Sequence, residues 1–192
     1  MPSPEIVLVR HGETEWSRDG RHTGKSDIPL TAEGRRQAEA LRSELAGRTF
    51  SLVLTSPLQR ARETCRLAGY GPVAQPRPDL VEWDYGGYDG LTSTQIAEIQ
   101  PDWSLWRDGG PGGEQPADVG RRADRVLAEI RTVAGNVLIF THGHVLRVIT
   151  ARWLGGPPAA GQHYALQTAA VSVLGYEHQN PVIWHWNRPP RL

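Results

Sequence analysis

The sequence predicts an α/β fold in which helices cover both faces of a central sheet. Three short runs of β-favouring apolar residues, 6–9 (IVLV), 51–55 (SLVLT) and 137–140 (VLIF), are typical of buried strands. Segments with the helical spacing of apolar residues come between and after these runs, and this alternation predicts helices on both faces of the sheet. Two more β-rich stretches, 169–175 and 182–186, close the chain.

The first strand leads into a polar, glycine-containing loop over residues 12–30. Thr31 follows, and its hydroxyl is placed to accept a hydrogen bond from the first turn of a helix. Apolar residues at helical spacing continue that helix as far as Gly47, which is expected to end it.

A second helix is expected directly after the strand at 51–55. Ser56 supplies a capping hydroxyl, and Pro57 supplies the backbone angle that is favoured at the first helical residue. The helix would run from there to about Gly69. A proline-rich connection over residues 72–78 follows it.

The second half of the chain continues the alternation. Thr92 is placed to cap a short helix. Residues 100–116 contain two tryptophans and a Gly-Gly-Pro-Gly-Gly run, a composition suited to a mobile flap over a site. The spacing of apolar residues predicts longer helices over 117–133 and 143–154.

The length of 192 residues suits a single domain over residues 1–192, with a flap or small cap region around 83–116. The formal net charge is zero at pH 7, so bulk charge favours neither nucleic acid nor a membrane surface as a partner. No stretch is long and apolar enough to span a bilayer, and the first residues lack the pattern of a secretory signal. We therefore expect a cytoplasmic protein.

Charged side chains follow the predicted strands at the points where the strands end. Because the carboxyl ends of strands in an open α/β sheet border a ligand crevice, we expect the two histidine-bearing ends to lie side by side. Arginines beside histidines suit a phosphate dianion, since a guanidinium can bind two phosphate oxygens at once. The residues that form this group are Arg10, His11, Arg60, Arg62, Glu82, His142 and His144, of which Arg62 is expected on another helix face, in a surface salt bridge.

The chemistry expected at this edge is phosphoryl transfer. An imidazole crowded by guanidinium groups should have a lowered pKa and stay neutral, so it can attack phosphorus and hold a phosphoryl group. The alkoxide that leaves must be protonated, and Glu82 is the candidate acid. Helices that start near Ser56 and Gly143 would add backbone N–H groups and a positive dipole end.

Four motifs resemble the signatures of the histidine phosphatase superfamily, in its phosphoglycerate-mutase-like branch. They are residues 10–14 (RHGET), 55–61 (TSPLQRA), 82–86 (EWDYG) and 141–144 (THGH), in the order expected for that family. The resemblance implies a three-layer α/β/α sandwich with a mixed, mainly parallel sheet. It also implies that no metal and no other cofactor is needed, because arginines and histidines stabilise the charge.

The resemblance also implies a role for each matching residue. His11 would be the nucleophile that becomes phosphohistidine, and Glu82 would act as general acid and then as general base. Arg10, Arg60 and His142 would line the phosphoryl pocket. The expected substrate-binding residues are Ser17, Thr23, Gly24, Gly143 and His144. His144 is equally compatible with a plain polar residue at a helix start.

Departures from the mutase pattern bear on the reaction. The mutases carry asparagine where this chain has Ser17, and they have a longer insert with two adjacent arginines that clamp the carboxylate of phosphoglycerate. Here the adjacent pair Arg121 and Arg122 lies in a predicted helix, and the segment between Glu82 and His142 is short. The extended tail of the mutases is also not matched. We therefore expect water to reach the phosphoenzyme.

The predicted function is that of a metal-independent phosphatase acting on small phosphorylated metabolites, such as sugar phosphates, through a phosphohistidine intermediate. The runs 82–90 and 106–109 look closest to acid phosphatases and to sedoheptulose-bisphosphatase-like members of the family. The expected partner is therefore a small phosphorylated molecule. The sequence is compatible with both a monomer and a homodimer, and it does not name the substrate.

Two other functions stay open at this point. One is a cofactor-dependent phosphoglycerate mutase, and the other is a non-catalytic module that binds a phosphorylated ligand. The complete set of charged residues argues against the second, since a degenerate relative would be expected to lose one of them. A metal site at His142 and His144 is not expected, because no cysteine and no third nearby histidine completes a ligand set.

Overall fold

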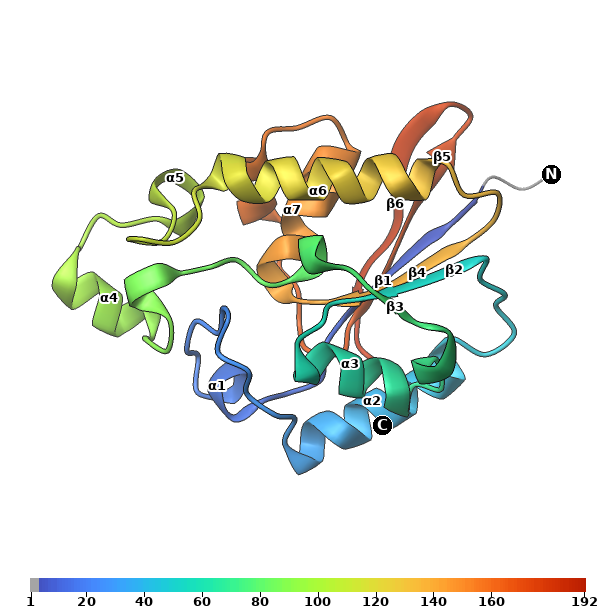
Figure 1. Cartoon of the computed structure of the whole chain (residues 1–192), viewed down its shortest axis with the longest axis horizontal. Coiled ribbons are helices and arrows are strands. Elements are labelled where there is room, and N and C mark those ends of the chain that lie inside the picture. The colour runs from blue at the N-terminus through green and yellow to red at the C-terminus, as the bar shows by residue number, and fades with distance from the viewer. Residues whose placement is uncertain (1–3) are drawn as a thin grey trace.

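The computed structural model describes residues 4–192, and within them a six-stranded sheet lies between two layers of helices (Figure 1). The strand order is β3-β2-β4-β1-β5-β6. The pairs β1–β4, β2–β4 and β2–β3 are parallel, whereas β5 runs antiparallel to both β1 and β6. The strands are β1 (Ile6–Arg10), β2 (Leu52–Thr55), β3 (Gln75–Pro76), β4 (Val137–Thr141), β5 (Val171–Glu177) and β6 (Asn180–Arg188). The mixed, mainly parallel sheet is confirmed.

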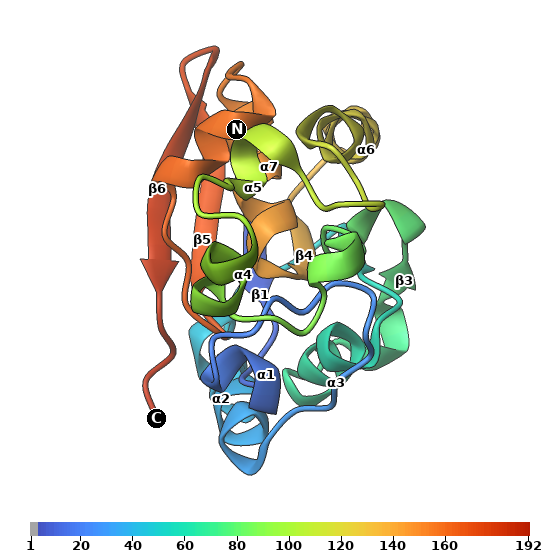
Figure 2. The same cartoon turned by 90° about the vertical axis from the view of Figure 1, so that its left-hand side faces the viewer.

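Helices cover both faces of this sheet, as the alternation in the sequence predicts. In Figures 1 and 2, α6 and α7 lie on one face and α2 and α3 on the other. The α-helices are α1 (Glu15–Arg18), α2 (Ala32–Glu44), α3 (Gln59–Leu67), α4 (Ser93–Ile99), α5 (Leu105–Asp108), α6 (Pro116–Arg131) and α7 (Gly143–Trp153). Short 3-10 helices span Gly71–Val73, Pro78–Leu80, Gly86–Tyr88 and Pro158–His163.

Side chains that alternate along the strands build two separate cores. On β1, Ile6 and Leu8 face α6 and α7, whereas Val7 and Val9 face α2 and α3, and all four are buried. A strand that is apolar on both faces can therefore occupy the centre of the sheet, which explains its unbroken hydrophobic run. In the part of the chain that the structure describes, no helix has the length and apolarity that a membrane crossing requires.

Two predicted helix starts are confirmed by their capping hydrogen bonds. The Thr31 hydroxyl accepts a hydrogen bond from the Gly34 N–H at the start of α2. The Thr92 hydroxyl accepts one from the Gln95 N–H at the start of α4, and the Gln95 side chain bonds back to the Thr92 backbone. These reciprocal bonds satisfy donors that would otherwise be left free in the first turn.

The predicted start of the next helix is wrong by a few residues. Helix α3 begins at Gln59, and a remote residue, Asp27, accepts the hydrogen bond from the Gln59 N–H. The Ser56 hydroxyl does not cap α3: it accepts a hydrogen bond at 3.3 Å from the N–H of Leu58, the residue before the helix, and it lies 2.7 Å from a ring nitrogen of His142. The predicted loop 12–30 also contains the short helix α1, which Thr14 caps.

The segment from 83 to 116 lies beyond the carboxyl ends of the parallel strands, toward the viewer in Figure 2. It contains α4, α5 and the glycine-rich loop. That loop is fixed by hydrogen bonds, since the Glu114 N–H donates to the Asp84 carbonyl and the Trp103 indole donates to the Gly109 carbonyl. A Cβ atom on Gly110 would lie 2.4 Å from a backbone atom of Tyr85, so only glycine allows this close approach.

Candidate active site

Three parallel strands end at the same level and bring the site together. Strand β1 pairs with β4 in a register that places Arg10 opposite Thr141. Beyond the strand ends, the His11 N–H donates to the Thr141 carbonyl and the Ser56 N–H donates to the Phe140 carbonyl, each at 2.9 Å. The expectation that the two histidine-bearing ends lie side by side is confirmed.

His11 presents a neutral imidazole with one free nitrogen. Its Nδ1 lies 2.7 Å from the Gly12 carbonyl, and because a carbonyl only accepts hydrogen bonds, Nδ1 must carry the proton. The pKa of His11 is held well below its usual value by burial, and further by the nearby guanidinium groups of Arg60 and Arg10. The unprotonated Nε2 is therefore available as a nucleophile.

His142 is fixed in the opposite tautomer. Arg60 donates from Nε to the Nδ1 of His142 at 3.1 Å, and because a guanidinium cannot accept, Nδ1 must be unprotonated. The proton is on Nε2, which donates to the Ser56 hydroxyl at 2.7 Å. Burial and then Arg60 hold the pKa of His142 well below its usual value. The His11 and His142 rings meet edge to face, with centroids 5.2 Å apart.

The Arg60 guanidinium is buried and almost fully bonded to protein atoms. Its two Nη atoms donate to the carbonyls of Thr23, Gly24 and Ser26 at 2.8 to 3.1 Å. Asp89 in turn accepts hydrogen bonds from the backbone N–H groups of Gly24 and Ser26. The first loop, Arg60 and His142 are thus joined in one hydrogen-bonded chain.

Arg10 has a buried nitrogen that lacks a partner. Its Nη1 donates to the Leu166 carbonyl at 2.5 Å, but its Nε is the one buried side-chain nitrogen or oxygen among residues 4–192 that makes no hydrogen bond. Nε lies 3.3 Å from where a Cβ atom would sit on Gly143, so a side chain there would crowd it. A buried donor without an acceptor is costly, and an anion at this place would satisfy it.

Glu82 caps the amino terminus of α7 from a distant part of the chain. Its Oε1 accepts hydrogen bonds from the Trp83 and Val145 N–H groups, at 2.8 and 3.0 Å, and its Oε2 accepts one from the His144 N–H at 3.0 Å. Since Glu82 caps the helix, His142 at the N-cap position is free to use its ring elsewhere. The carboxyl group therefore lies at the positive end of the helix dipole.

His144 forms a second, outer histidine position. The Tyr85 hydroxyl lies 2.5 Å from its Nδ1. Burial raises the pKa of Tyr85, whereas burial and then the charge of Arg147 lower the pKa of His144, so the hydroxyl donates to a neutral imidazole. The His22 ring stacks parallel to the His144 ring, with centroids 6.2 Å apart.

These residues surround a cavity of about 280 Å³. It is lined by Arg10, His11, Ser17, Gly20, Arg21, His22, Thr23, Glu82, Tyr85, Ser93, Gly143, His144, Arg147 and Leu166. The expected site residues Arg60, His142 and Gly24 do not line it, because they are buried and hydrogen-bonded one layer behind. The Ser17 hydroxyl borders the cavity but already bonds to the Thr14 backbone in the cap of α1.

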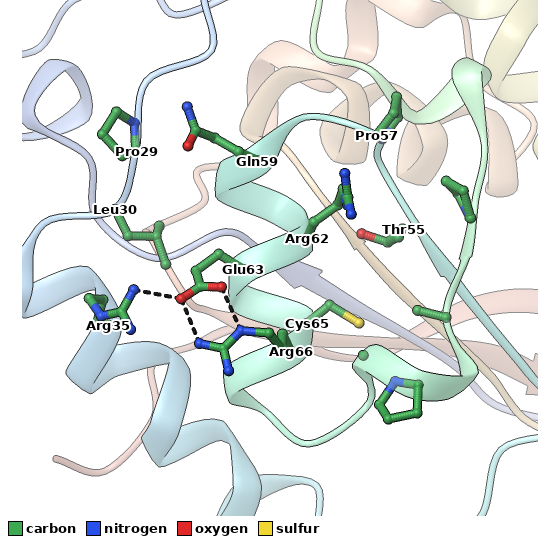
Figure 3. Close-up of a pocket in the computed structure, with 14 residues that line it drawn as sticks. Pro29, Leu30, Arg35, Thr55, Pro57, Gln59, Arg62, Glu63, Cys65 and Arg66 are labelled. Carbon is green, nitrogen blue, oxygen red and sulfur yellow. Dashed lines mark hydrogen bonds and ion pairs between the residues drawn. The ribbon is translucent and has the colours of Figure 1, made fainter.

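A larger cavity, of about 930 Å³, lies around α3 and is shown in Figure 3. No histidine lines it, and its glutamate, Glu63, is engaged in ion pairs with Arg35 and Arg66. The groups able to carry out chemistry converge in the smaller cavity. Among residues 4–192 there is no cluster of three or more histidine, cysteine, aspartate or glutamate side chains placed to hold a metal ion.

Two residues of the cavity, Arg147 and Tyr85, are not among the site residues expected from the sequence, where Tyr85 is only a neighbour of Glu82. A signal for Arg147 was present, because it follows His144 by three residues and so shares its helix face. The bond between Tyr85 and His144 had no such signal. It depends on how a loop meets a helix that lies far away in the sequence.

Comparison with known proteins agrees with this geometry. A family model described as the histidine phosphatase superfamily (branch 1) matches residues 6–189. An acid phosphatase of Mycobacterium tuberculosis is 43% identical over 178 residues, which cover 90% of this chain and 87% of that protein. A sedoheptulose 1,7-bisphosphatase of Saccharomyces cerevisiae is 34% identical, over 81% of this chain and 70% of that protein.

A solved structure agrees equally well. The product of an open reading frame of Mycobacterium tuberculosis superposes with a TM-score of 0.93 at 38% identity, covering 98% of this chain and 99% of that one. The likeness therefore extends over the whole described fold, including both strand ends that carry the histidines.

Proposed function

The chain belongs to branch 1 of the histidine phosphatase superfamily and is a phosphoric monoester hydrolase, and we propose that it hydrolyses small phosphorylated metabolites through a phosphohistidine at His11. The reaction needs no metal in this proposal, because guanidinium groups and backbone N–H groups stabilise the charge. The substrate is a phosphomonoester dianion bound in the cavity of about 280 Å³.

In the first step Nε2 of His11 attacks phosphorus, and the bond between phosphorus and the ester oxygen breaks. A P–N bond replaces it, and the departing alkoxide takes a proton from the Glu82 carboxyl to leave as an alcohol. Arg10 stabilises the phosphoryl oxygens, and its unpartnered Nε gains an acceptor. His142 is held by Arg60 and Ser56 beside the nucleophile.

In the second step water hydrolyses the phosphohistidine. Glu82, now a carboxylate, takes a proton from a water molecule, and the resulting hydroxide attacks phosphorus. The P–N bond breaks and its electron pair returns to Nε2 of His11. Inorganic phosphate leaves, and the site returns to its starting protonation state.

The observation that carries the proposal is the buried Nε of Arg10, which makes no hydrogen bond within the described chain and belongs to a guanidinium that lines the cavity with His11. A cation fixed in this way beside a neutral imidazole favours the binding of an anionic substrate that the imidazole can attack. A purely structural arginine would be expected to have its buried donors satisfied.

The test is phosphate release from p-nitrophenyl phosphate in the presence of EDTA. We expect turnover in the chelator, and a loss of at least about 10³-fold in kcat for His11→Ala. His185→Ala is the matched control, since His185 is exposed on β6 and does not line the cavity. Full turnover by His11→Ala would overturn the proposal.

A second measurement tests the intermediate. An enzyme quenched during turnover of a ³²P-labelled ester should carry a label that is lost in acid and retained in base, as phosphohistidine requires. His11→Ala should carry no label. Conversion between 2- and 3-phosphoglycerate faster than phosphate release would instead identify the site as that of a mutase.

A further inference from the structure

The cavity contains more positive charge than one phosphoryl group requires. Arg10 lines the cavity and is assigned to the reacting phosphoryl group, but Arg21 and Arg147 line the same cavity and neither forms an ion pair with a residue in the described range 4–192. The one acidic side chain in the lining is Glu82, and three backbone N–H groups already bond to it. Two cations at the cavity therefore form no ion pair with it.

Arg147 is held in place as a binding group would be. Its Nε donates to the Gly161 carbonyl at 2.9 Å and its Nη2 donates to the Gln162 carbonyl at 3.0 Å. The guanidinium carbon lies 4.5 Å from the centre of the Trp106 ring, so one face is stacked. Nη1 makes no hydrogen bond to the described protein atoms. Burial lowers the pKa of Arg147, and the nearby Glu82 acts in the opposite direction without forming an ion pair with it, so the charge is only partly compensated within the protein.

We propose that Arg147 binds a second anionic group of the substrate, so that preferred substrates carry a carboxylate or a second phosphate in addition to the reacting phosphoryl group. The inference rests on the proposed function, since it assigns the far end of the same substrate. Arg21, whose Nη1 donates to the Gly90 carbonyl at 3.1 Å, adds positive charge to the lining from the first loop.

The geometry favours a ligand over a structural role for this charge. Both carbonyls that Arg147 contacts belong to the short helix Pro158–His163, and a neutral donor would satisfy them equally well. A guanidinium that is already immobilised loses little further entropy when an anion binds, which makes it an effective recognition group.

The experiment compares esters that differ only in the second group. The first pair is 3-phosphoglycerate and glycerol 3-phosphate, which differ by a carboxylate in place of a hydroxymethyl group. The second pair is fructose 1,6-bisphosphate and fructose 6-phosphate. We expect the wild-type enzyme to have the higher kcat/KM for the doubly anionic member of at least one pair, and that pair identifies the carboxylate or the phosphate as the preferred group.

The variant Arg147→Gln should lower that preference by about tenfold to a hundredfold, the value of one charge-assisted hydrogen bond. Arg147→Lys should retain part of it, because the charge remains but the planar fork is lost. Arg131→Gln is the control, since Arg131 also stacks on a tryptophan, Trp153, but lies outside the cavity. A preference absent from wild type, or unchanged in Arg147→Gln, would overturn the inference.

Binding measurements separate this inference from the proposed function. In His11→Ala, where no phosphoryl transfer is expected, titration calorimetry should give a lower Kd for the doubly anionic ester, and Arg147→Gln added to it should remove the difference. Equal Kd values for the two esters would contradict the anion subsite. If the wild-type enzyme hydrolyses no ester but this difference in Kd persists, the proposed function fails and the subsite stands.

Discussion

Two neighbouring histidines are held in opposite tautomers. One is bound by a carbonyl, which can only accept a hydrogen bond, and the other by a guanidinium, which can only donate one. The Gly12 carbonyl fixes the proton of His11 on Nδ1, and the Arg60 guanidinium fixes the proton of His142 on Nε2. One ring therefore offers a lone pair while the other offers an N–H. The lone pair of His11 borders the cavity, whereas the N–H of His142 is already donated to the Ser56 hydroxyl, so this second ring holds its place behind the nucleophile.

The hydroxyl of Ser56 is the group that orients the His142 ring from its other side. We expect Ser56→Ala to lower kcat about tenfold with little change in KM, because His142 loses its Nε2 partner without any loss of charge. The measurement is steady-state phosphate release. Ser43→Ala is the control, since the exposed Ser43 hydroxyl bonds only to its own helix. An equal effect in both variants would contradict this role of Ser56.

The pH dependence of activity follows from the lowered pKa of His11. The nucleophile must be neutral, and an imidazole with a lowered pKa stays neutral well below pH 6.5. We therefore expect kcat/KM to persist as the pH falls through 6.5 and to decline only at more acidic pH. A pH profile of p-nitrophenyl phosphate hydrolysis measures it. A decline centred at or above pH 6.5 would contradict a buried neutral nucleophile.

At this scale the sequence predicted which residue types meet but not how they are bonded. His11, Glu82 and His142 followed from strand ends and motifs, because those features are local. The unpartnered Nε of Arg10 and the bond between Tyr85 and His144 depend on side-chain directions across the fold, for which the linear pattern has no signal.

At the scale of elements, α6 positions Glu82, the proposed general acid, through a buried arginine. Arg122 donates to the carbonyls of Asp79, Val81 and Glu82 and forms an ion pair with Glu114 at 2.7 Å. The strand-like segment that carries Glu82 has no sheet partner, so these bonds replace the sheet in fixing it. The adjacent arginines of this chain therefore have different roles: Arg122 is buried and structural, whereas its neighbour is exposed.

We expect Arg122→Ala to lower the free energy of unfolding by about 3 kcal/mol or more, because it removes one partner of a largely buried ion pair and three carbonyl contacts. Arg125→Ala, one turn along α6, breaks the exposed ion pair with Asp79 and should cost less than about 1 kcal/mol. Urea denaturation measures both. Similar losses in the two variants would contradict the distinction between them.

We propose that residues 83–116 act as a cap over the site, as their composition suggests. Tyr85 and Ser93 from this segment line the cavity, and the Trp106 ring stacks against the Arg147 guanidinium. The glycines that pack against residues 84–86 tie the cap to the segment that carries Glu82.

The sequence predicted most elements and failed where tertiary contacts decide the boundaries. The starts of α2 and α4 followed from their own capping residues. The start of α3 did not, because Asp27 supplies the cap from another loop and Ser56 is used by His142. The strand β3 has two residues, too few for any periodic signal.

For the whole molecule, the buried histidines make the fold sensitive to acid. The pKa values of His11, His142 and His144 are lowered in the folded state, whereas in the unfolded chain they return to about 6.5. Below pH 6.5 the unfolded chain binds protons that the folded protein does not, so the free energy of unfolding should decrease as the pH falls. Above pH 6.5 these groups contribute no pH dependence.

Denaturation at pH 7.5, 6.5 and 5.5 measures this effect. The decrease should be steeper between 6.5 and 5.5 than between 7.5 and 6.5, with at most about 1.4 kcal/mol per pH unit for each histidine. Replacing His142 by Gln should reduce the slope, whereas the exposed His185→Gln should leave it unchanged. A slope that does not respond to His142→Gln would contradict the linkage.

The pairing of β1 with β4 has a consequence for biogenesis. The two strands pair directly, with Ile6 opposite Val137, although a long segment separates them in the sequence. That whole segment must therefore emerge from the ribosome before the two strands can pair. A nascent chain that lacks β4 contains His11 but not His142, so we expect it to be inactive toward phosphate esters until β1 and β4 have paired. The recovery of enzyme activity during refolding should therefore report when β1 pairs with β4, two strands that are far apart in the sequence.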